Sequence, residues 1–378
     1  MDDDDEFALD PDLIYLNHAA VAPWPRRTAA AVSAFAEENA RFGSRNYPVW
    51  VETETRLRTR LARLLNAASK DDIALLKSTS EGLSVVAYGL DWRAGDRIVT
   101  AREEFPSNRI VWESLAPLGV SVGAVALTGA PDPEAALIAA LDRDTRLLSV
   151  SAVQYGDGLR LDLERLGREC RRRGVLFCVD AIQALGAVAF DVQAIGADFV
   201  TADGHKWMLG PEGLALFYVR PELRERIALR QYGWHMVEHA GDFDRRDWEP
   251  ARTAQRFECG SPNMLGIHGL EASLGLLETV GMTRVESELK RKMNWLHDKL
   301  SKFDELEVLS PGDPARRAGI LTYRPRHVEP RIQFEALRAA GVQCALRGGG
   351  IRLSPHFYTK ESQLESTSNL IYKFSHGG

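Results

Sequence analysis

The chain has 378 residues, of which 45% are hydrophobic and 26% are charged, and its formal net charge is −6. This is the composition of a globular enzyme, and the acidic balance argues against a nucleic-acid-binding protein. No apolar stretch approaches the roughly 20 residues that a membrane-spanning helix requires. The run Met1 to Glu6 is acidic where a secretory signal would be basic, so we expect a solvated, disordered end and a cytoplasmic protein.

The cysteines favour a reducing compartment and give no sign of a metal site. Cys170, Cys178, Cys259 and Cys344 are scattered, without a CxxC motif or metal-ligand spacing. Cys178 lies inside an apolar run and is most simply a small core residue.

The first predicted elements are a short apolar run at 13–16 and two helices, one from about 25 to 39 and one from about 51 to 66. The apolar run ends in Asn17 and His18. On the residues alone, His18 is a histidine packed against the N-terminal segment or one that faces a site, and both readings stay open.

A strand at 73–76 is followed by a turn rich in hydroxyl groups and then by an apolar helix. A helix that begins at Thr79 and Ser80 would present its free N–H groups and the positive end of its dipole, which together form a phosphate-binding site. The same residue types also serve as an ordinary helix cap.

Strands and helices then alternate, which is typical of βαβ units in a mainly parallel sheet. The predicted strands lie at 97–100, 121–127, 146–153 and 213–219, with helices at 134–140 and 161–173. Phe105 and Gln154 follow two of these strands. Ligands of open α/β sheets bind at such strand ends.

The apolar run 175–179 predicts a strand buried on both faces, and it ends in Asp180. A buried carboxylate needs a cationic partner, because an unpaired buried charge is costly. The protonated nitrogen of a pyridine ring would serve as that partner.

A further buried strand, beginning near Val200, breaks at Gly204 into a segment that carries Lys206. The breaks at Gly204 and Gly210 place Lys206 on a loop. Trp207 and Met208 follow it, so we expect partly apolar surroundings, which favour the neutral amine that carbonyl chemistry requires.

The sequence Asp180-Ala181-Ile182-Gln183, followed by Gly204-His205-Lys206 and Gly210-Pro211-Glu212-Gly213, resembles the class V aminotransferase family of pyridoxal-phosphate enzymes. Cysteine desulfurases, selenocysteine lyases, isopenicillin N epimerase and kynureninase belong to this family. The resemblance extends from about Tyr15 to Tyr358. It implies a fold type I enzyme that acts at the α-carbon of an amino acid through an imine between substrate and pyridoxal 5'-phosphate.

The resemblance also implies residue roles. Lys206 would bind the cofactor covalently and shuttle the Cα proton, Asp180 would pair with the ring nitrogen, and Phe105 would stack on the ring. Gln183 would bond the ring hydroxyl, and Gln154 would lie near the ring. The implied phosphate ligands are Thr79, Ser80, His205 and Ser261 of the partner subunit, which implies a homodimer with shared active sites. The implied substrate contacts are Arg352, Arg347 and His18.

The C-terminal part predicts a smaller α+β domain. Its helices are expected at 265–280, 284–303 and 332–340, with a strand at 319–323. Within it, the glycine-rich stretch from Arg347 to Ser354 is either a flexible basic hairpin or the site of a substrate-carboxylate fork. The predicted organisation is therefore an N-terminal segment 1–20 that packs on the small domain, a large cofactor-binding domain 21–262 with a doubly wound sheet, and a small domain 263–378.

Three departures from the family pattern bear on the reaction. Relatives that form a persulfide carry a cysteine just before the arginine that matches Arg352, and here Gly348 to Ile351 occupy that interval. Phe105 stands where desulfurases have a histidine, and a phenyl ring cannot transfer protons. Asp203 stands where some relatives have a small hydroxyl residue that binds phosphate, so this acid must turn away, pair, or belong to a different arrangement.

With no persulfide cysteine, an aminotransferase-like or C–S lyase-like activity is preferred over sulfur relay. Desulfurase or selenocysteine lyase chemistry without that cysteine, and epimerisation, stay open. A non-enzymatic sensor that binds the cofactor is a further alternative, although no spare basic segment is present for DNA binding. A nucleotide-binding protein would need a glycine-rich phosphate loop after its first strand, and none is found.

Overall fold

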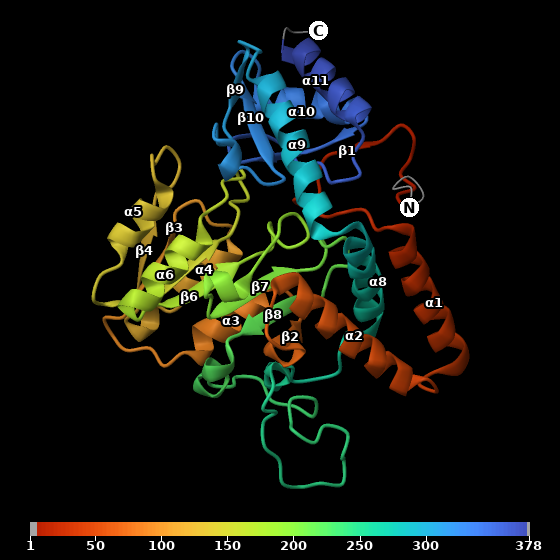
Figure 1. Cartoon of the computed structure of the whole chain (residues 1–378), viewed down its shortest axis with the longest axis vertical. Coiled ribbons are helices and arrows are strands. Elements are labelled where there is room, and N and C mark those ends of the chain that lie inside the picture. The colour runs from red at the N-terminus through yellow and green to blue at the C-terminus, as the bar shows by residue number, and fades with distance from the viewer. Residues whose placement is uncertain (1–5, 376–378) are drawn as a thin grey trace.

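A computed structural model describes residues 6–375 of the chain, so residues 1–5 of the acidic run lie outside the described residues. Glu6 ends that run and is not freely solvated, because its carboxylate accepts a hydrogen bond from Arg27 Nε at 2.8 Å. The centre of the molecule is a seven-stranded sheet with the order β2-β8-β7-β6-β5-β3-β4 (Figure 1). Its strands are β2 (Ile73–Leu76), β3 (Arg97–Ala101), β4 (Ser121–Val125), β5 (Thr145–Ser151), β6 (Leu176–Asp180), β7 (Phe199–Asp203) and β8 (Ala215–Val219).

Strand direction in this sheet places the ends of β5, β6 and β7 side by side. These three strands run parallel, as do β3 and its two neighbours, whereas β8 runs antiparallel to β2 and β7. Asp180, at the end of β6, is in register with Ser151 of β5 and Thr201 of β7. The carboxyl ends of parallel strands therefore form one edge, where open α/β sheets bind ligands.

Helices cover both faces of the sheet, which explains why its strands are apolar runs. Phe177 and Val179 of β6 belong to the core on one face and Cys178 to the core on the other. The first face is covered by α2 (Tyr47–Leu65), α6 (Leu163–Arg173), α7 (Val192–Ile195) and α8 (Met264–Val280), and the second by α3 (Thr79–Gly89) and α4 (Ser107–Glu113). Two further helices are α1 (Arg26–Phe42), which packs on α8, and α5 (Pro133–Ala140). The predicted doubly wound, mainly parallel sheet is confirmed.

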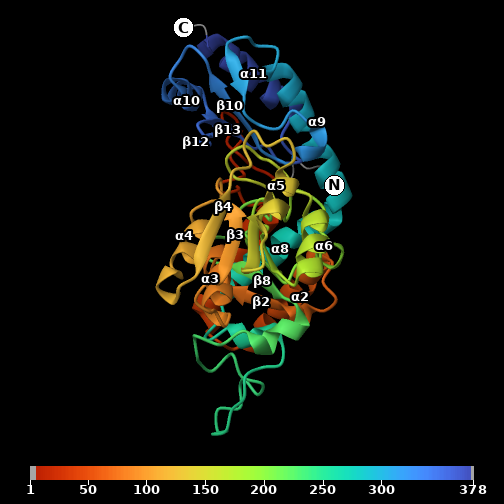
Figure 2. The ribbon, with the colours of Figure 1, turned by 90° about the vertical axis from the view of Figure 1, so that its left-hand side faces the viewer.

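The C-terminal part forms a smaller α+β unit at one end of the molecule (Figures 1 and 2). Its antiparallel sheet has the order β12-β13-β10-β9. The strands are β9 (Leu306–Val308), β10 (Leu321–Pro325), β12 (Ala345–Arg347) and β13 (Gly350–Leu353), and the helices are α9 (Met282–Leu300), α10 (Pro330–Ala339) and α11 (Glu361–Ser375). A separate core that includes Leu296 and Tyr323 holds this unit together.

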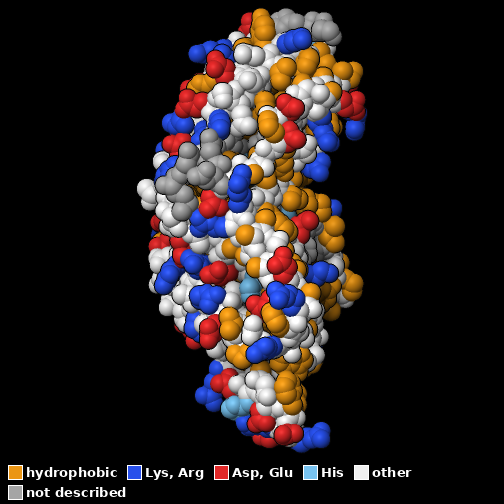
Figure 3. Space-filling view, turned by 90° about the vertical axis from the view of Figure 1, so that its right-hand side faces the viewer, with side chains coloured by type: hydrophobic (Ala, Val, Ile, Leu, Met, Phe, Trp, Pro, Cys, Tyr) orange, Lys and Arg blue, Asp and Glu red, His pale blue; other side chains and the backbone are white. Residues whose placement is uncertain are grey.

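The N-terminal segment is attached to the smaller unit. Strand β1 (Ile14–Tyr15) pairs in parallel with β11 (Val342–Gln343), and Asn17 forms an isolated bridge with Ser354. The division at residue 262 stays a prediction, and α8, which follows it, packs against α1 and α2. Viewed from the side that carries α1, the surface is hollowed on one edge between the upper and lower parts of the molecule (Figure 3).

Within residues 6–375, no helix combines the length and the apolar character needed to cross a membrane.

Candidate active site

Lys206 lies on the loop that joins β7 to β8, as the glycine pattern predicted. Three backbone hydrogen bonds close this loop on itself: Gly204 N–H to Leu214 O at 2.9 Å, Leu209 N–H to Lys206 O at 2.9 Å, and Gly210 N–H to Gly204 O at 2.8 Å. Leu209 adopts a φ of 62°, a conformation that is uncommon for a residue with a side chain. The loop is thus held in one shape, and the base of the Lys206 side chain is fixed.

The Lys206 amine is desolvated. The residue is 9% exposed, and Nζ lies 5.7 Å from the centre of the Phe105 ring. Burial lowers the pKa of Lys206 to about 8, although Asp180 and Asp203 act in the opposite direction. A substantial fraction of this amine is therefore neutral near pH 8.

Asp180 is a buried carboxylate, with 2% of its surface exposed. Its Oδ1 accepts a hydrogen bond from the backbone N–H of Ile182 at 3.0 Å. Burial raises the pKa of Asp180 to about 7, and the Lys206 charge opposes this shift. A cationic partner in the cavity would favour the ionised form.

Asp180 and Lys206 face the same cavity, of about 220 Å³. Both groups can therefore reach one bound molecule. The residues that line the cavity are Ala19, Ala20, Thr79, Phe105, Ser107, Tyr155, Asp180, Ile182, Gln183, Asp203, His205, Lys206, Arg347 and Arg352.

One end of the cavity lies at the start of α3. Thr79 begins the helix and lines the cavity, and Ser80 next to it is exposed and donates to Ser107 Oγ at 2.8 Å. His205 Nδ1 is buried without a hydrogen-bond partner among the described residues. This end therefore offers hydroxyl groups, a helix N-terminus and an unsatisfied imidazole nitrogen.

The other end of the cavity is formed by the β12–β13 hairpin. Arg352 is buried and donates from Nη1 to the Tyr155 carbonyl at 2.9 Å, while its Nε has no partner among residues 6–375. Arg347 is exposed and donates to the carbonyl of Leu346, its own neighbour. Burial, followed by the charge of Arg347, lowers the pKa of Arg352 to about 10. Two guanidinium groups that face a cavity favour an anionic ligand.

Comparison with known proteins places this site in a family. The model of the family described as aminotransferase class V matches residues 14–366. The chain is 31% identical to a probable cysteine desulfurase of Methanothermobacter thermautotrophicus, over 94% of this chain and 92% of that protein.

The chain belongs to the class V aminotransferase family.

Solved structures agree on the fold. The apo cysteine desulfurase of Thermococcus onnurineus superposes with a TM-score of 0.88 at 23% identity, covering 99% of this chain and 98% of that one. The cystine C–S lyase C-DES, in complex with cysteine persulfide, also gives a TM-score of 0.88, at 22% identity, covering 96% and 98%. This class V protein is therefore a pyridoxal-phosphate-dependent enzyme of fold type I, and its cofactor is pyridoxal phosphate.

The residues of the cavity fit that cofactor. The group offers a basic ring nitrogen, an aldehyde and a phosphate, and the cavity provides a buried acid, a desolvated amine and a helix start beside an orphaned imidazole nitrogen. Gln183 also lines the cavity, although its amide already donates to Ala19 O at 3.0 Å and accepts from Trp207 Nε1 at 2.7 Å. One N–H of this amide is left for a ligand.

Four residues given site roles from the sequence do not line the cavity, namely His18, Ser80, Gln154 and Ser261. His18 is fully buried, and its ring contacts Ser354 O at 2.9 Å and Tyr358 Oη at 2.6 Å. Gln154 donates to Glu104 Oε1 at 3.0 Å, and Ser261 is exposed. Both ring nitrogens of His18 are thus engaged within the protein.

The sequence interpretation missed several residues of the site. Tyr155 and Ser107 line the cavity, and the Tyr155 ring meets Phe105 edge to face at 5.2 Å. Glu104 lies behind this wall and accepts from Ser151 N–H at 2.8 Å and from Gln154 Nε2. The sequence held part of the information, because Glu104 and Tyr155 each follow a predicted strand, where ligands of such sheets bind.

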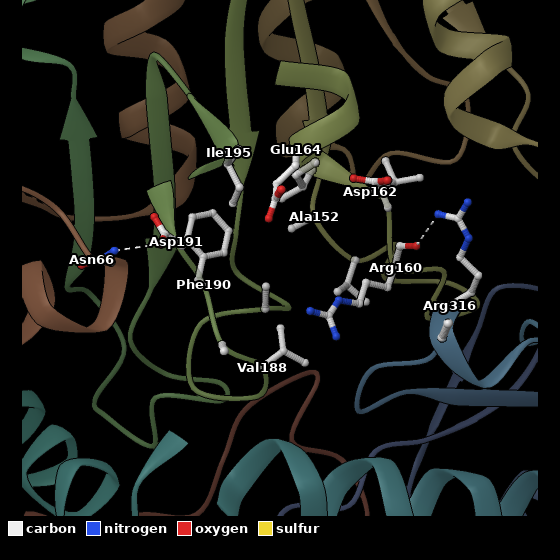
Figure 4. A pocket seen from close by; sticks show the side chains of 16 residues that line it. Asn66, Ala152, Arg160, Asp162, Glu164, Val188, Phe190, Asp191, Ile195 and Arg316 are labelled. Atoms are coloured by element: carbon white, nitrogen blue, oxygen red, sulfur yellow. Dashed lines mark hydrogen bonds between the residues drawn. The ribbon is translucent and has the colours of Figure 1, made fainter. Parts of the chain in front are cut away.

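A larger cavity, of about 700 Å³, lies away from these residues (Figure 4). Val188, Phe190 and Ile195 line its apolar part, and Asp191 accepts from Asn66 Nδ2 at 2.8 Å at one side. None of the residues given a site role from the sequence lines it.

A buried acidic cluster elsewhere has metal-ligand residue types but already holds a cation. Glu54, His235 and Glu258 bring ligand atoms within 4.8 Å of one another. Arg58 donates to Glu258 Oε2 at 2.7 Å and Oε1 at 2.5 Å, and it pairs with Glu54 as well. The guanidinium therefore satisfies both carboxylates.

Proposed function

We propose that this enzyme cleaves the C–S bond of a sulfur-containing amino acid such as cysteine, releasing the sulfur directly. The observation that carries the proposal is the single cavity that joins the Asp180 carboxylate, the Lys206 amine and the Arg352 guanidinium. The similarity to a probable cysteine desulfurase and to a cystine C–S lyase favours a sulfur-containing substrate.

The proposed cofactor contacts follow from where each side chain lies. Asp180 holds the ring nitrogen, one N–H of Gln183 reaches the ring hydroxyl, and Phe105, 41% exposed at the mouth, stacks on the ring. Gln154, which donates to Glu104 behind the cavity wall, supports the ring from there. The phosphate ligands are Thr79, Ser80, His205 and Ser261 of the partner subunit.

The bound cofactor supplies an electron sink for the pair left when the Cα–H bond breaks. Lys206 Nζ takes that proton in its neutral form and returns it as an acid. Arg352, with Arg347 beside it, holds the substrate carboxylate in a charge-assisted pair and so fixes which bond of Cα faces Lys206. Phe105 and Tyr155 limit water at the mouth.

No cysteine lines this cavity. Cys170, Cys178 and Cys344 are buried, and burial raises the pKa of Cys170 and of Cys344 to about 12 and that of Cys178 still higher. The thiolate, not the thiol, is the sulfur nucleophile. These three cysteines are therefore poor acceptors for a protein persulfide, and Cys259, which is partly buried, does not line the cavity. Cysteine would then be converted with water into sulfide, pyruvate and ammonia.

The first experiment tests the lysine. Wild-type enzyme treated with pyridoxal phosphate and borohydride should carry a reduced adduct on Lys206 by peptide mass spectrometry. Lys206→Ala should carry no such adduct, while the control Lys70→Ala, at an exposed site, should behave as wild type. An adduct of unchanged yield in Lys206→Ala would contradict the assignment.

The second experiment identifies the reaction. Enzyme incubated with cysteine should release sulfide and pyruvate in equal amounts, and a variant with all four cysteines replaced by alanine or serine should retain this activity. Loss of sulfide release in a folded four-cysteine variant would favour a persulfide relay. Formation of the pyridoxamine form with a keto acid, and no sulfide, would favour transamination instead.

We further propose a cytoplasmic homodimer. The four cysteines are free, which suits a reducing compartment. Tyr232, Phe243 and Trp248 are large exposed apolar side chains on the long loop after β8, and apolar side chains gather along one edge of the face in Figure 3. Sedimentation at micromolar concentration should give twice the chain mass, and a monomer with full activity would contradict the shared site.

A further inference from the structure

Asp203 is the acid of the cavity that the mechanism above does not use. It ends β7, is 9% exposed and lines the cavity three residues before Lys206. An acid at this place is unexpected, because the neighbouring start of α3 is the seat proposed for the dianionic phosphate of the cofactor.

Asp203 lines the cavity, and it pairs with no arginine or lysine among the residues that the structure describes. Its Oδ2 accepts the backbone N–H of Thr79 at 3.2 Å, and its own backbone N–H donates to Thr79 Oγ1 at 3.1 Å. The carboxylate therefore takes a helix N–H that would otherwise be free for a phosphate oxygen. The Thr79 hydroxyl keeps its proton for donation to a ligand.

The surroundings of Asp203 do not neutralise it fully. Burial raises the pKa of Asp203, and the Thr79 bonds and the Lys206 charge oppose that shift. Glu212, from the same loop, and Asp180, at the end of β6, act as like charges. His205 is held neutral, because burial lowers its pKa to about 4. Lys206 is the one cation in this set, and it loses its charge when it reacts with the cofactor aldehyde.

We propose that Asp203 takes up a proton when the phosphate of the cofactor binds, so that the neutral carboxyl group can lie beside the phosphate dianion and donate a hydrogen bond to it. The inference rests on the phosphate seat assigned above to Thr79. Two adjacent anions at one helix start repel each other, and a proton bound by Asp203 removes that repulsion. The phosphate is dianionic above about pH 6, so above that pH the proton must come from solution to the protein.

The consequence is a cofactor affinity that depends on pH. The pKa of Asp203 is higher with phosphate bound than without it, so binding is strongest below the free-state pKa and weakens as pH rises toward the bound-state pKa. Uptake of one proton corresponds to a dissociation constant that increases about tenfold per pH unit within that window.

The test uses pyridoxine 5'-phosphate, which has no aldehyde and cannot react with Lys206. Its binding to the cofactor-free protein is measured by titration calorimetry from about pH 7 to about pH 8.5, where the phosphate is a dianion, in buffers of different ionisation enthalpy. Wild type should take up about one proton per probe more than the Asp203 variants described below, and its dissociation constant should increase more steeply with pH, by up to about tenfold per pH unit.

Two variants and a control isolate Asp203. Asp203→Asn and Asp203→Ser should bind the probe at each pH, take up about one proton fewer than wild type, and bind more tightly than wild type at the alkaline end. Glu212→Gln removes an exposed acid that does not line the cavity, and it should keep the wild-type proton uptake.

The outcomes distinguish a failure of the Asp203 proposal from a failure of the phosphate site. The role of Asp203 is overturned if wild type binds the probe without taking up a proton. It is also overturned if both Asp203 variants take up as many protons as wild type. Either result leaves the cofactor site intact. Failure of the probe to bind wild type at any pH overturns the phosphate seat itself. Because Asp180 and Lys206 also titrate near this pH range, the difference in proton uptake between wild type and either folded Asp203 variant decides the question.

Discussion

The residues of the large unit that line the cavity, here called its floor, and those of the β12–β13 hairpin, here called its rim, are held by different means. On the floor, Asp180 lies at the end of the buried strand β6, and Lys206 lies on a loop that is closed by its own backbone hydrogen bonds. On the rim, Arg347 lies at the exposed turn of the β12–β13 hairpin and bonds only the carbonyl of its own neighbour among the interactions described. A preorganised floor suits a cofactor that stays bound, and a looser rim suits substrates that must enter and leave.

The largest effect is expected on the floor. Asp180→Asn keeps the shape of the side chain but removes the negative charge that stabilises a protonated ring. The turnover number should decrease about 100- to 1000-fold, with a smaller change in KM. Steady-state kinetics on fully loaded enzyme would check this, and a loss below tenfold would show that the ring nitrogen is not held by this carboxylate.

Arg352→Met tests the buried arginine of the rim. The substitution preserves apolar packing and removes the partner of the substrate carboxylate, so kcat/KM should decrease about 100-fold, mostly through KM. Because Arg352 is buried and also bonds Tyr155, thermal unfolding should be measured alongside to separate binding from stability. An unchanged KM would place the substrate carboxylate elsewhere.

Lys206 should show its lowered pKa in the cofactor-free protein. Reductive methylation requires the neutral amine, so its rate at Lys206 should rise about tenfold per pH unit below the pKa and level off above it. With a pKa of about 8, the plateau should begin near that pH. Peptide mass spectrometry gives the rate for this residue, and Asp180→Asn should move the plateau to lower pH, because Asp180 favours the charged amine.

Arg347→Met should have the smallest effect. Arg347 is exposed, and a solvent-screened charge contributes about 1 kcal/mol or less, so kcat/KM should change by a few-fold at most. The effect should diminish further at high salt. A loss as large as that of Arg352→Met would mean that the hairpin closes on the substrate and buries this guanidinium.

The contrast between floor and rim also marks what the sequence could predict. The apolar runs before Asp180 and Lys206 read as buried strands, and both strands and their terminal residues are found where the patterns placed them. The strands of the smaller unit were mostly missed, because β9, β11, β12 and β13 have two to four residues each and are too short to show a period. Gly348 and Gly349 were expected to allow a close backbone approach. They have φ of 61° and 77° and form the turn between β12 and β13.

Side-chain partners across the fold lie beyond such patterns. That His18 would bond Tyr358, or that Gln154 would be held by Glu104, depends on residues far apart in the chain that only the folded sheet brings together. The family resemblance assigned roles to both positions, but it could not show that His18 and the Gln154 Nε2 group have partners within the protein.

The attachment of the N-terminal segment has a consequence for opening and closing. Residues 14–18 are bonded to the smaller unit through β11 and Ser354. Ala19 itself joins the two units, because its N–H donates to Ser354 Oγ at 3.0 Å and its carbonyl accepts from Gln183 at 3.0 Å. The two units can therefore separate here only if one of these bonds breaks. Inserting two or three glycines between His18 and Ala19 should loosen the entrance and speed product escape without altering any group that touches the reacting atoms.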